Sequence, residues 1–243
     1  MNEKVVVITG GGEGLGKIVA QKLAALNAKV AIVGLKENQL ANTTQEISSD
    51  TKYYVCDISD STQVASTVNS IVSDFGRIDI LINNAGVWTE EELEKTKPEQ
   101  RKRVFEVNAY GNIEFTKAVE PIMRKQDSGH ILNVISVSGT DDSAAGDNTL
   151  WQTYGASKWA LAGFTRALKD SLAGTGIKVT GIYPGGFESN LYENAGNPTE
   201  IQHNQPWMMQ TSDVADALIF CLTRPDDMLV EKLVVTKFTR EVQ

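Results

Sequence analysis

Tyr154 and Lys158 are the residues whose types and spacing suggest chemistry most directly. They lie four positions apart in a stretch with a helical pattern, so both side chains face one side of a helix and can interact. A phenol has a reference pKa near 10, and lowering that pKa by about three units requires roughly 4 kcal/mol. An ammonium group about 4 Å away supplies about that much at an effective dielectric constant near 20. The pair therefore indicates proton transfer at a carbonyl or alcohol oxygen, which a serine hydroxyl can orient.

The segment VVVITGGGEGLG, residues 5–16, predicts a phosphate-binding turn. Its four leading strand formers suit a strand covered on both faces. Gly10, Gly14 and Gly16 then let the backbone turn tightly and approach a ligand closely. The helix that follows offers unpaired N–H groups and a positive dipole end to a pyrophosphate. A glycine-rich loop without a ligand is the alternative, since the spacing differs from the G-x-G-x-x-G of the longer dinucleotide-binding fingerprint.

Strands and helices alternate along the rest of the chain without a linker or a repeat. Apolar and β-branched runs predict seven strands, at residues 5–8, 29–33, 52–56, 78–82, 131–135, 178–183 and 232–235. Helical patterns fill the connections, with Asp60 and Gln63 as a capping box, Gly76 as a helix end and Pro98 as a first helical residue. We therefore expect one doubly wound, Rossmann-type α/β domain over residues 1–243, with a parallel sheet and helices on both faces.

The composition excludes several other classes of function. The net charge is −8, the sequence pI is about 4.9 and no basic run occurs, so nucleic acid is not an expected partner. Two cysteines without a C-x-x-C pair and two distant histidines predict neither disulfides nor a metal site. No signal peptide and no apolar run of membrane-spanning length are recognised. These features are typical of a cytoplasmic protein without a membrane partner.

Five stretches, in order and across essentially the whole chain, resemble the short-chain dehydrogenase/reductase family. On its own the spacing of Tyr154 and Lys158 is weak, because a half-exposed tyrosine over a solvated lysine gives the same pattern. The other four stretches are the coenzyme turn TGGGEGLG, the strand end Cys56-Asp57, the loop NNAG and the segment VNAYG, and Pro184-Gly185 also resembles the family's segment after the sixth strand. Each stretch taken alone could also have a purely structural role, as Asn83 and Asn84 could simply cap a turn. Five matches in the family's order make such separate explanations jointly improbable.

The resemblance implies a hydride transfer between a nicotinamide coenzyme and a carbonyl/alcohol pair. Tyr154 would be the general acid and base, and Lys158 would lower the pKa of its phenol and bind the nicotinamide ribose. Ser136 would orient the substrate, with Ser138 as the fallback on the same strand face. Asn108 would hold a water that links Lys158 to solvent, although this asparagine could instead simply bend its helix. The alternatives are an epimerase or dehydratase on the same scaffold and a non-catalytic dinucleotide sensor.

The coenzyme-binding residues that the resemblance implies lie mainly after the carboxyl ends of strands, where ligands of such sheets bind. They are Thr9, Gly10, Gly12, Glu13, Gly14, Leu15, Gly16, Gly34, Lys36, Asp57, Ile58, Asn84, Ala85, Gly86, Tyr154, Lys158, Pro184, Gly185, Phe187 and Ser189.

The choice between NADP(H) and NAD(H) depends on the end of the second strand. Gly34 stands where an NAD site places a carboxylate, and Lys36 is the nearest base in sequence. Leu35 and Glu13 stand where NADP-using relatives often carry basic residues, which weakens the case. A lysine is a flexible point charge, so we expect only about tenfold preference for NADP(H), with NAD(H) still used. Lys36 as a merely solvated residue is the alternative.

The substrate is expected to be a small carbonyl or alcohol whose identity the sequence leaves open. The spacing between Ser136 and Tyr154 is longer than is usual in the family, which suggests an insertion at residues 140–151 over the substrate. Residues 187–211 are long enough for a substrate lid. Six large apolar residues could line a pocket or simply pack: Trp88, Trp151, Phe187, Trp207, Met208 and Met209. The resemblance also implies a homodimer or homotetramer.

Overall fold

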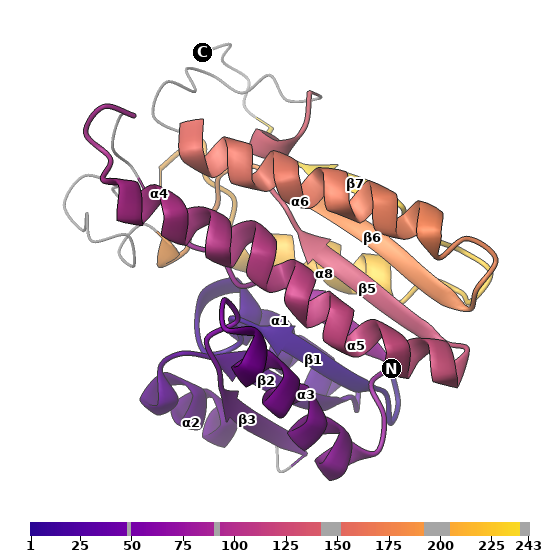
Figure 1. Ribbon diagram of the computed structural model, residues 1–243. Coiled ribbons are helices and arrows are strands. Elements are labelled where there is room, and N and C mark those ends of the chain that lie inside the picture. Colours follow the sequence, from indigo (N-terminus) through magenta and orange to yellow (C-terminus); the bar gives the residue numbers. More distant parts are fainter. Residues whose placement is uncertain (48–49, 90–92, 142–151, 192–204, 239–243) are drawn as a thin grey trace.

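Seven parallel strands form a single sheet in the residues that this computed structural model describes, which are 1–47, 50–89, 93–141, 152–191 and 205–238 (Figure 1). The strands are β1 (Val5–Thr9), β2 (Lys29–Gly34), β3 (Thr51–Val55), β4 (Ile80–Asn83), β5 (Gly129–Val134), β6 (Ile177–Pro184) and β7 (Lys232–Val235). Their order is β3-β2-β1-β4-β5-β6-β7, which confirms the predicted doubly wound fold. The predicted bounds were one or two residues off at one or both ends of every strand except β7.

Helices cover both faces of this sheet (Figure 1). One face carries α1 (Gly14–Ala25), α2 (Glu37–Glu46) and α8 (Thr211–Leu222), and the other carries α3 (Ser61–Phe75), α5 (Asn112–Gln126) and α6 (Gln152–Ser171). Successive strand residues alternate between the two faces. Thus Ile8 packs under α1 in one apolar cluster, while Val7 packs under α3 and α5 in the other. Burial on both faces explains why the strands read as continuous apolar runs.

The long helix predicted from Pro98 has an irregular centre. α4 (Pro98–Phe105) continues through a π-helical segment, Glu106–Gly111, into α5. Pro98 is the first helical residue, as predicted, and Pro121 lies inside α5. A π-turn leaves carbonyls without their usual α-helical partners. Here Nδ2 of Asn112 donates to the carbonyls of Val107 (3.1 Å) and Asn108 (2.9 Å), so a side chain stabilises the wider turn that carries Asn108.

The start of α3 fixes the end of β3. Asp60 caps the helix, because its side chain accepts hydrogen bonds from the backbone N–H groups of Thr62 and Gln63. The predicted capping box is wrong in its second half: Oε1 of Gln63 accepts from the N–H of Asp57 (3.0 Å), not from that of Asp60. Gly76 ends the helix with φ +77°, as predicted. The capping residues therefore also hold the backbone of Asp57, which faces a cavity described below.

The crevice for a ligand lies where the strand order reverses. β1 pairs with both β2 and β4, and the chain leaves these strands towards opposite ends of the sheet. Such a switch point opens a crevice at the carboxyl ends of the strands. In the described part of the chain, no helix combines the length and apolarity needed to cross a bilayer.

Candidate active site

Two cavities open at the carboxyl edge of the sheet and share the glycine turn after β1. The narrow cavity measures ≈ 170 Å³ and the wide cavity ≈ 720 Å³. The predicted residues that line the narrow cavity are Gly10, Glu13, Gly14, Leu15, Asn84, Ala85, Gly86, Ser136, Tyr154, Lys158, Pro184, Gly185, Phe187 and Ser189. The further ones that line the wide cavity are Gly12, Gly34, Lys36, Asp57 and Ile58. An elongated ligand can therefore contact both cavities along the turn.

The glycine turn is shaped for close approach by a ligand. Gly10 and Gly14 have φ values of +67° and +52°, which favour glycine, and a Cβ on Gly14 would meet nothing within 4 Å. A Cβ on Gly16 would overlap the carbonyl of Gly10, so this glycine permits the turn itself. Glu13 precedes α1 without capping it by its side chain, so the helix N-terminus can receive an anion. These features fit the pyrophosphate of a dinucleotide.

Thr9 and Asn84 tie this turn to the loop after β4. Oγ1 of Thr9 accepts from the N–H groups of Asn84 (3.1 Å) and Ala85 (3.0 Å). In return, Nδ2 of Asn84 donates to the carbonyls of Thr9 (2.9 Å) and Gly10 (3.2 Å). Thr9 is fully buried, and the structure places it and Gly16 behind the cavity walls. Both residues hold the walls in position.

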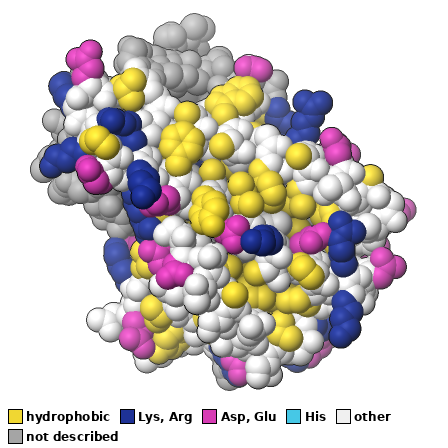
Figure 2. All heavy atoms as spheres, in the orientation of Figure 1, with side chains coloured by type: hydrophobic (Ala, Val, Ile, Leu, Met, Phe, Trp, Pro, Cys, Tyr) yellow, Lys and Arg dark blue, Asp and Glu magenta, His cyan; other side chains and the backbone are white. Residues whose placement is uncertain are grey.

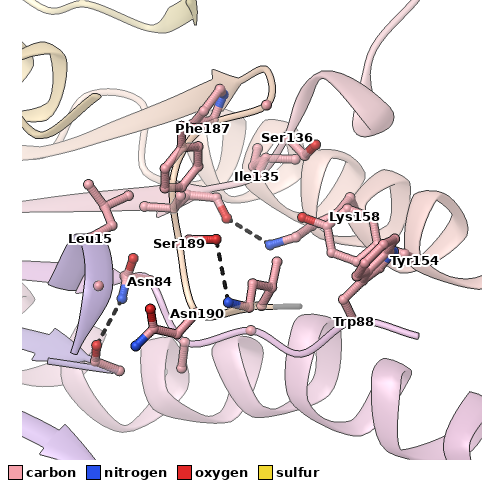
Figure 3. Close-up of a pocket in the computed structure, with 18 of the residues that line it drawn as sticks. Leu15, Asn84, Trp88, Ile135, Ser136, Tyr154, Lys158, Phe187, Ser189 and Asn190 are labelled. Carbon is pink, nitrogen blue, oxygen red and sulfur yellow. Dashed lines mark hydrogen bonds between the residues drawn. The ribbon is translucent and has the colours of Figure 1, made fainter. Parts of the chain in front are cut away.

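Lys158 and Tyr154 lie side by side on α6 at the far end of the narrow cavity (Figure 3). Lys158 is only 3% exposed, its Nζ donates to the carbonyl of Val134 (3.0 Å), and Nζ lies 5.6 Å from the centroid of the Tyr154 ring. Burial of the ammonium group lowers the pKa of Lys158 to about 8. The arrangement brings a buried cation to the phenol, as the four-residue spacing predicted.

Ser136 lies in the cavity wall near this pair, whereas Ser138 does not. The placement of both serines on one strand face was wrong, because β5 ends at Val134 and both belong to a short 3₁₀ turn, Val137–Gly139, and its cap. Oγ of Ser136 accepts from the N–H of Ser138 (3.1 Å). The Ser138 hydroxyl is buried and has no hydrogen-bond partner in the part of the chain described. The position of Ser136 thus suits contact with a substrate better than the position of Ser138 does.

Asn108 holds the loop after β4 against the helix of Tyr154. Its Oδ1 accepts from the N–H of Val87 (2.8 Å), and its Nδ2 donates to the carbonyl of Val87 (2.8 Å) and to Oγ of Ser157 (3.0 Å). Ser157 in turn donates to the carbonyl of Tyr154 (2.6 Å). Asn108 is fully buried and lines neither cavity. These contacts position α6, and the role in a water relay stays a prediction.

The wide cavity contains an ion pair whose arginine the sequence did not indicate. Asp57 accepts from the N–H (2.9 Å) and hydroxyl (2.7 Å) of Ser59, and it lies 3.0 Å from Nη2 of Arg103 on α4. Burial raises the pKa of Asp57, but the hydrogen bonds from Ser59 and Arg103 outweigh it and leave that pKa below its ordinary value. Arg103 belongs to no motif, so only the contact of α4 with the segment after β3 could reveal it.

Several predicted pocket residues prove to be packing residues. Trp88 and Phe187 do line the narrow cavity, whereas Met208 and Met209 are buried, and Met209 belongs to the core beside α8. Trp207 packs against Gly186. Trp151, most of the predicted insertion at 140–151 and residues 192–204 of the predicted lid at 187–211 lie outside the described residues, so both roles stay predictions.

Comparisons with known proteins agree on one family. A family model described as short chain dehydrogenase matches residues 4–200. An uncharacterized oxidoreductase of Staphylococcus epidermidis is 30% identical over 235 residues, which is 97% of each chain. Among solved structures, the 3-ketoacyl-(acyl-carrier-protein) reductase from Brucella melitensis complexed with NADH is 28% identical over 97% of both chains, with a TM-score of 0.85. A metagenomic short-chain oxidoreductase in complex with NADP is 26% identical over 97% of both chains, with a TM-score of 0.79.

Proposed function

This chain belongs to the short-chain dehydrogenase family of oxidoreductases, and we propose that it transfers a hydride between NADP(H) or NAD(H) and a carbonyl or alcohol group. The observation that carries the proposal is the narrow cavity, whose wall joins Ser136, Tyr154 and Lys158 to the glycine turn. A dinucleotide held at that turn would reach along the same cavity to the phenol of Tyr154.

The residues present fit a nicotinamide dinucleotide. The glycine turn and the N-terminus of α1 would hold the pyrophosphate, the wide cavity would hold the adenosine, and Lys158 would bind the nicotinamide ribose. Two similar solved structures carry NADH and NADP respectively, which supports this class of coenzyme. When bound, the coenzyme supplies the hydride in reduction and accepts it in oxidation.

Tyr154 provides the proton that must accompany the hydride. In reduction, its phenol donates a proton to the carbonyl oxygen as the carbon receives the hydride, and solvent then reprotonates the phenolate. In oxidation, the phenolate removes the proton from the alcohol. The Ser136 hydroxyl hydrogen-bonds to the same substrate oxygen, and the buried charge of Lys158 stabilises the phenolate. Asn108 supports this geometry through Ser157 and α6.

We also propose a modest preference for NADP(H). Gly34 presents no carboxylate to a 2′-phosphate, and Lys36 lines the same wide cavity. A single flexible ammonium group supports about tenfold discrimination. Titration of both coenzymes against wild type and Lys36→Ala tests this: the variant should lose the preference. Equal or tighter NADH binding by wild type, unchanged in the variant, would contradict it.

A panel of ketones, aldehydes and keto acids with both coenzymes tests the main proposal. At least one class should be turned over, and Tyr154→Phe should lower kcat by about 10³-fold while coenzyme affinity changes by less than about threefold. Tyr53→Phe, on the exposed edge strand β3, is the matched control and should keep full activity. Coenzyme binding without turnover of any class would favour a sensor, and an active Tyr154→Phe would exclude this tyrosine as the acid.

A further inference from the structure

Apolar side chains form part of the wall of the narrow cavity. This apolar wall consists of Trp88 after β4, Ile135 after β5 and Leu191 after β6, and all three line the cavity that also contains Ser136 and Tyr154. Figure 3 shows Trp88 and Tyr154 at the end of the pocket away from the glycine turn. A ketone whose oxygen meets Ser136 and Tyr154 would therefore place its remaining groups against the apolar wall.

Trp88 is a fixed part of this wall. Its side chain is buried, and the residue before it is held at both main-chain groups. The N–H of Val87 donates to Oδ1 of Asn108, and the carbonyl of Val87 accepts from Nδ2 of the same side chain, both at 2.8 Å. An indole that is already in place can bind a flat apolar group with little further loss of conformational freedom. The wall is therefore suited to an aromatic or other flat apolar part of a substrate.

The charged side chains of the narrow cavity do not favour a substrate carboxylate. Among the described residues that line it, only Glu13 and Lys158 are charged, and Glu13 repels an anion. Lys158 is 3% exposed, and its Nζ donates to the carbonyl of Val134 (3.0 Å). A Cβ on Gly86 would lie 3.6 Å from the same Nζ, so the loop after β4 covers the ammonium group closely. This cation is enclosed by main chain and is not presented to a second anion.

The neighbouring segments of the sequence carry no strong base either. Residues 90–92, 142–151 and 192–204 are close in the chain to Trp88, Tyr154 and Leu191 and lie outside the described residues. They contain aspartate or glutamate but neither lysine nor arginine. An ionised carboxylate that leaves water without a cationic partner is strongly disfavoured. A substrate with a free carboxylate would meet this cost at the apolar wall.

We propose that the substrate is a neutral carbonyl or alcohol compound with an aromatic or other flat apolar group, which packs on Trp88 while its oxygen faces Ser136 and Tyr154. Compounds with a free carboxylate, such as keto acids, are poor substrates. This inference rests on the proposed function, because it needs hydride transfer at the narrow cavity. The chemical step is unchanged: the carbonyl carbon receives the hydride of the reduced coenzyme, and the oxygen receives the proton of Tyr154.

The first test compares benzylacetone with butanone, using the enzyme at saturating reduced coenzyme. The added phenyl ring leaves the reactivity of the carbonyl group almost unchanged, so kcat/KM should be at least about thirtyfold higher for benzylacetone. Trp88→Ala should lower this ratio at least about fivefold, whereas Trp88→Phe, which keeps a ring, should retain most of it. Trp159→Ala is the matched control, because Trp159 is 46% exposed and lines neither cavity, and it should leave the ratio unchanged.

The second test compares levulinate with its methyl ester, which differ by one charge at a distance from the ketone. The ester should have a kcat/KM at least about a hundredfold higher. Leu191→Arg brings a cation to the apolar wall and should lower the ratio of ester to acid at least about tenfold. Leu26→Arg is the matched control, because Leu26 is exposed and lines neither cavity, and it should change the ratio by less than about twofold. Comparing ratios between variants cancels any difference in the intrinsic reactivity of the two compounds.

Three outcomes would overturn the proposal and leave the proposed function standing. They are a preference of wild type for levulinate over its ester, a preference for the phenyl ring that Trp88→Ala leaves unchanged, and turnover of other carbonyl compounds without turnover of any of the three neutral ketones. Coenzyme binding without turnover of any carbonyl compound would instead refute the proposed function, and this inference with it.

Discussion

The two cavities differ in the contacts that hold their walls: the narrow cavity is the proposed catalytic end, and the wide cavity is the proposed adenosine end. At the catalytic end, Lys158 and Asn108 are buried and hydrogen-bond mainly to main-chain groups of Val134 and Val87. At the adenosine end, Lys36 pairs with Glu13, and Arg103 with Asp57, through partly exposed side chains. Main-chain partners in a packed fold fix an atom closely, whereas partly exposed ion pairs contribute about 0–1 kcal/mol each.

This difference implies different tolerance to substitution. The catalytic end should lose activity or stability when a single buried group changes, since an unsatisfied buried partner costs about 1–3 kcal/mol. The adenosine end should change its ligand preference in small steps while the protein stays folded. We therefore expect single substitutions to change the preference between NADP(H) and NAD(H) more easily than they change the catalysed reaction.

Lys158→Met should have the largest effect, because it should lower turnover while it raises the stability of the fold. Turnover should fall by at least about 10³-fold, since the phenolate of Tyr154 loses its buried cation. The free energy of unfolding at pH 7 should rise by about 2 kcal/mol, because burial of the ammonium group is costly, as its lowered pKa shows. Chemical denaturation and steady-state kinetics measure both. Lys169→Met is the control, because Lys169 lies on the same helix as Lys158 but is exposed and pairs with Glu231 before β7. This variant should change neither turnover nor the free energy of unfolding by much.

The pH dependence of stability measures the cost of burying Lys158 independently of activity. The pKa of Lys158 is about 8 in the folded protein and near 10.5 when unfolded. Between these values the unfolded chain binds more protons, so this lysine makes wild type more stable as pH rises from about 8 to 10.5, by up to about 3 kcal/mol. Wild type minus Lys158→Met isolates this contribution. If the difference stays constant across that range, Lys158 is not the buried cation described here.

Asn108→Leu should lower both stability and turnover. The substitution keeps the branched shape and the number of heavy atoms of the side chain but leaves the N–H and carbonyl of Val87 without their partners, so the free energy of unfolding should fall by about 2 kcal/mol. Turnover should fall more than coenzyme affinity, because the loop of Val87 and the helix of Tyr154 lose their link. Asn69→Leu, on the exposed side of α3, is the control. Equal losses in both variants would mean that Asn108 has no special positioning role.

The same two ends differ in how far the sequence predicts them. The order of elements and the glycine turn depend on local patterns, so the fold and the neighbourhood of Tyr154 and Lys158 could be read directly. Each of Asp57 and Glu13 has a partner that lies far away in sequence: Arg103 is 46 residues from Asp57, and Asn190 is 177 from Glu13. Such contacts depend on tertiary packing and carry no local signal.

The π-helical segment was missed for a related reason. Neither proline nor glycine marks its start, and a regular helical pattern runs through it. The residue that stabilises it, Asn112, is an ordinary helix-surface residue in the sequence and reveals its role only through its bonds to the freed carbonyls.

Exposed aromatic side chains gather on one face of the molecule, on the helices that also carry Tyr154 and Lys158 or contact them. Figure 2 shows hydrophobic side chains gathered over the face of α4, α5 and α6, where Phe105, Tyr110 and Trp159 are 41%, 47% and 46% exposed. We propose that a second copy of the chain covers this face, as the family resemblance implied. Trp159→Glu should weaken association by about a hundredfold, roughly 2.7 kcal/mol. Sedimentation at micromolar concentration measures it, with Leu26→Glu as the control. A monomeric wild type would refute the proposal.

Arg103→Met should give the smallest effect, although it removes an ion pair with Asp57 at 3.0 Å and the hydrogen bond from Nη1 to Oγ of Ser59 (2.5 Å). The arginine and Asp57 side chains are 36% and 28% exposed, so water screens the lost attraction. Asp57 also keeps both hydrogen bonds from Ser59 and the capping contact of its N–H with Gln63. The strand end therefore stays in place, and we expect coenzyme affinity to fall by less than about threefold and unfolding free energy by less than about 1 kcal/mol. Calorimetric titration and denaturation measure the two quantities. A loss as large as that of Asn108→Leu would show that the adenosine end is as rigidly built as the catalytic end, and the comparison would fail.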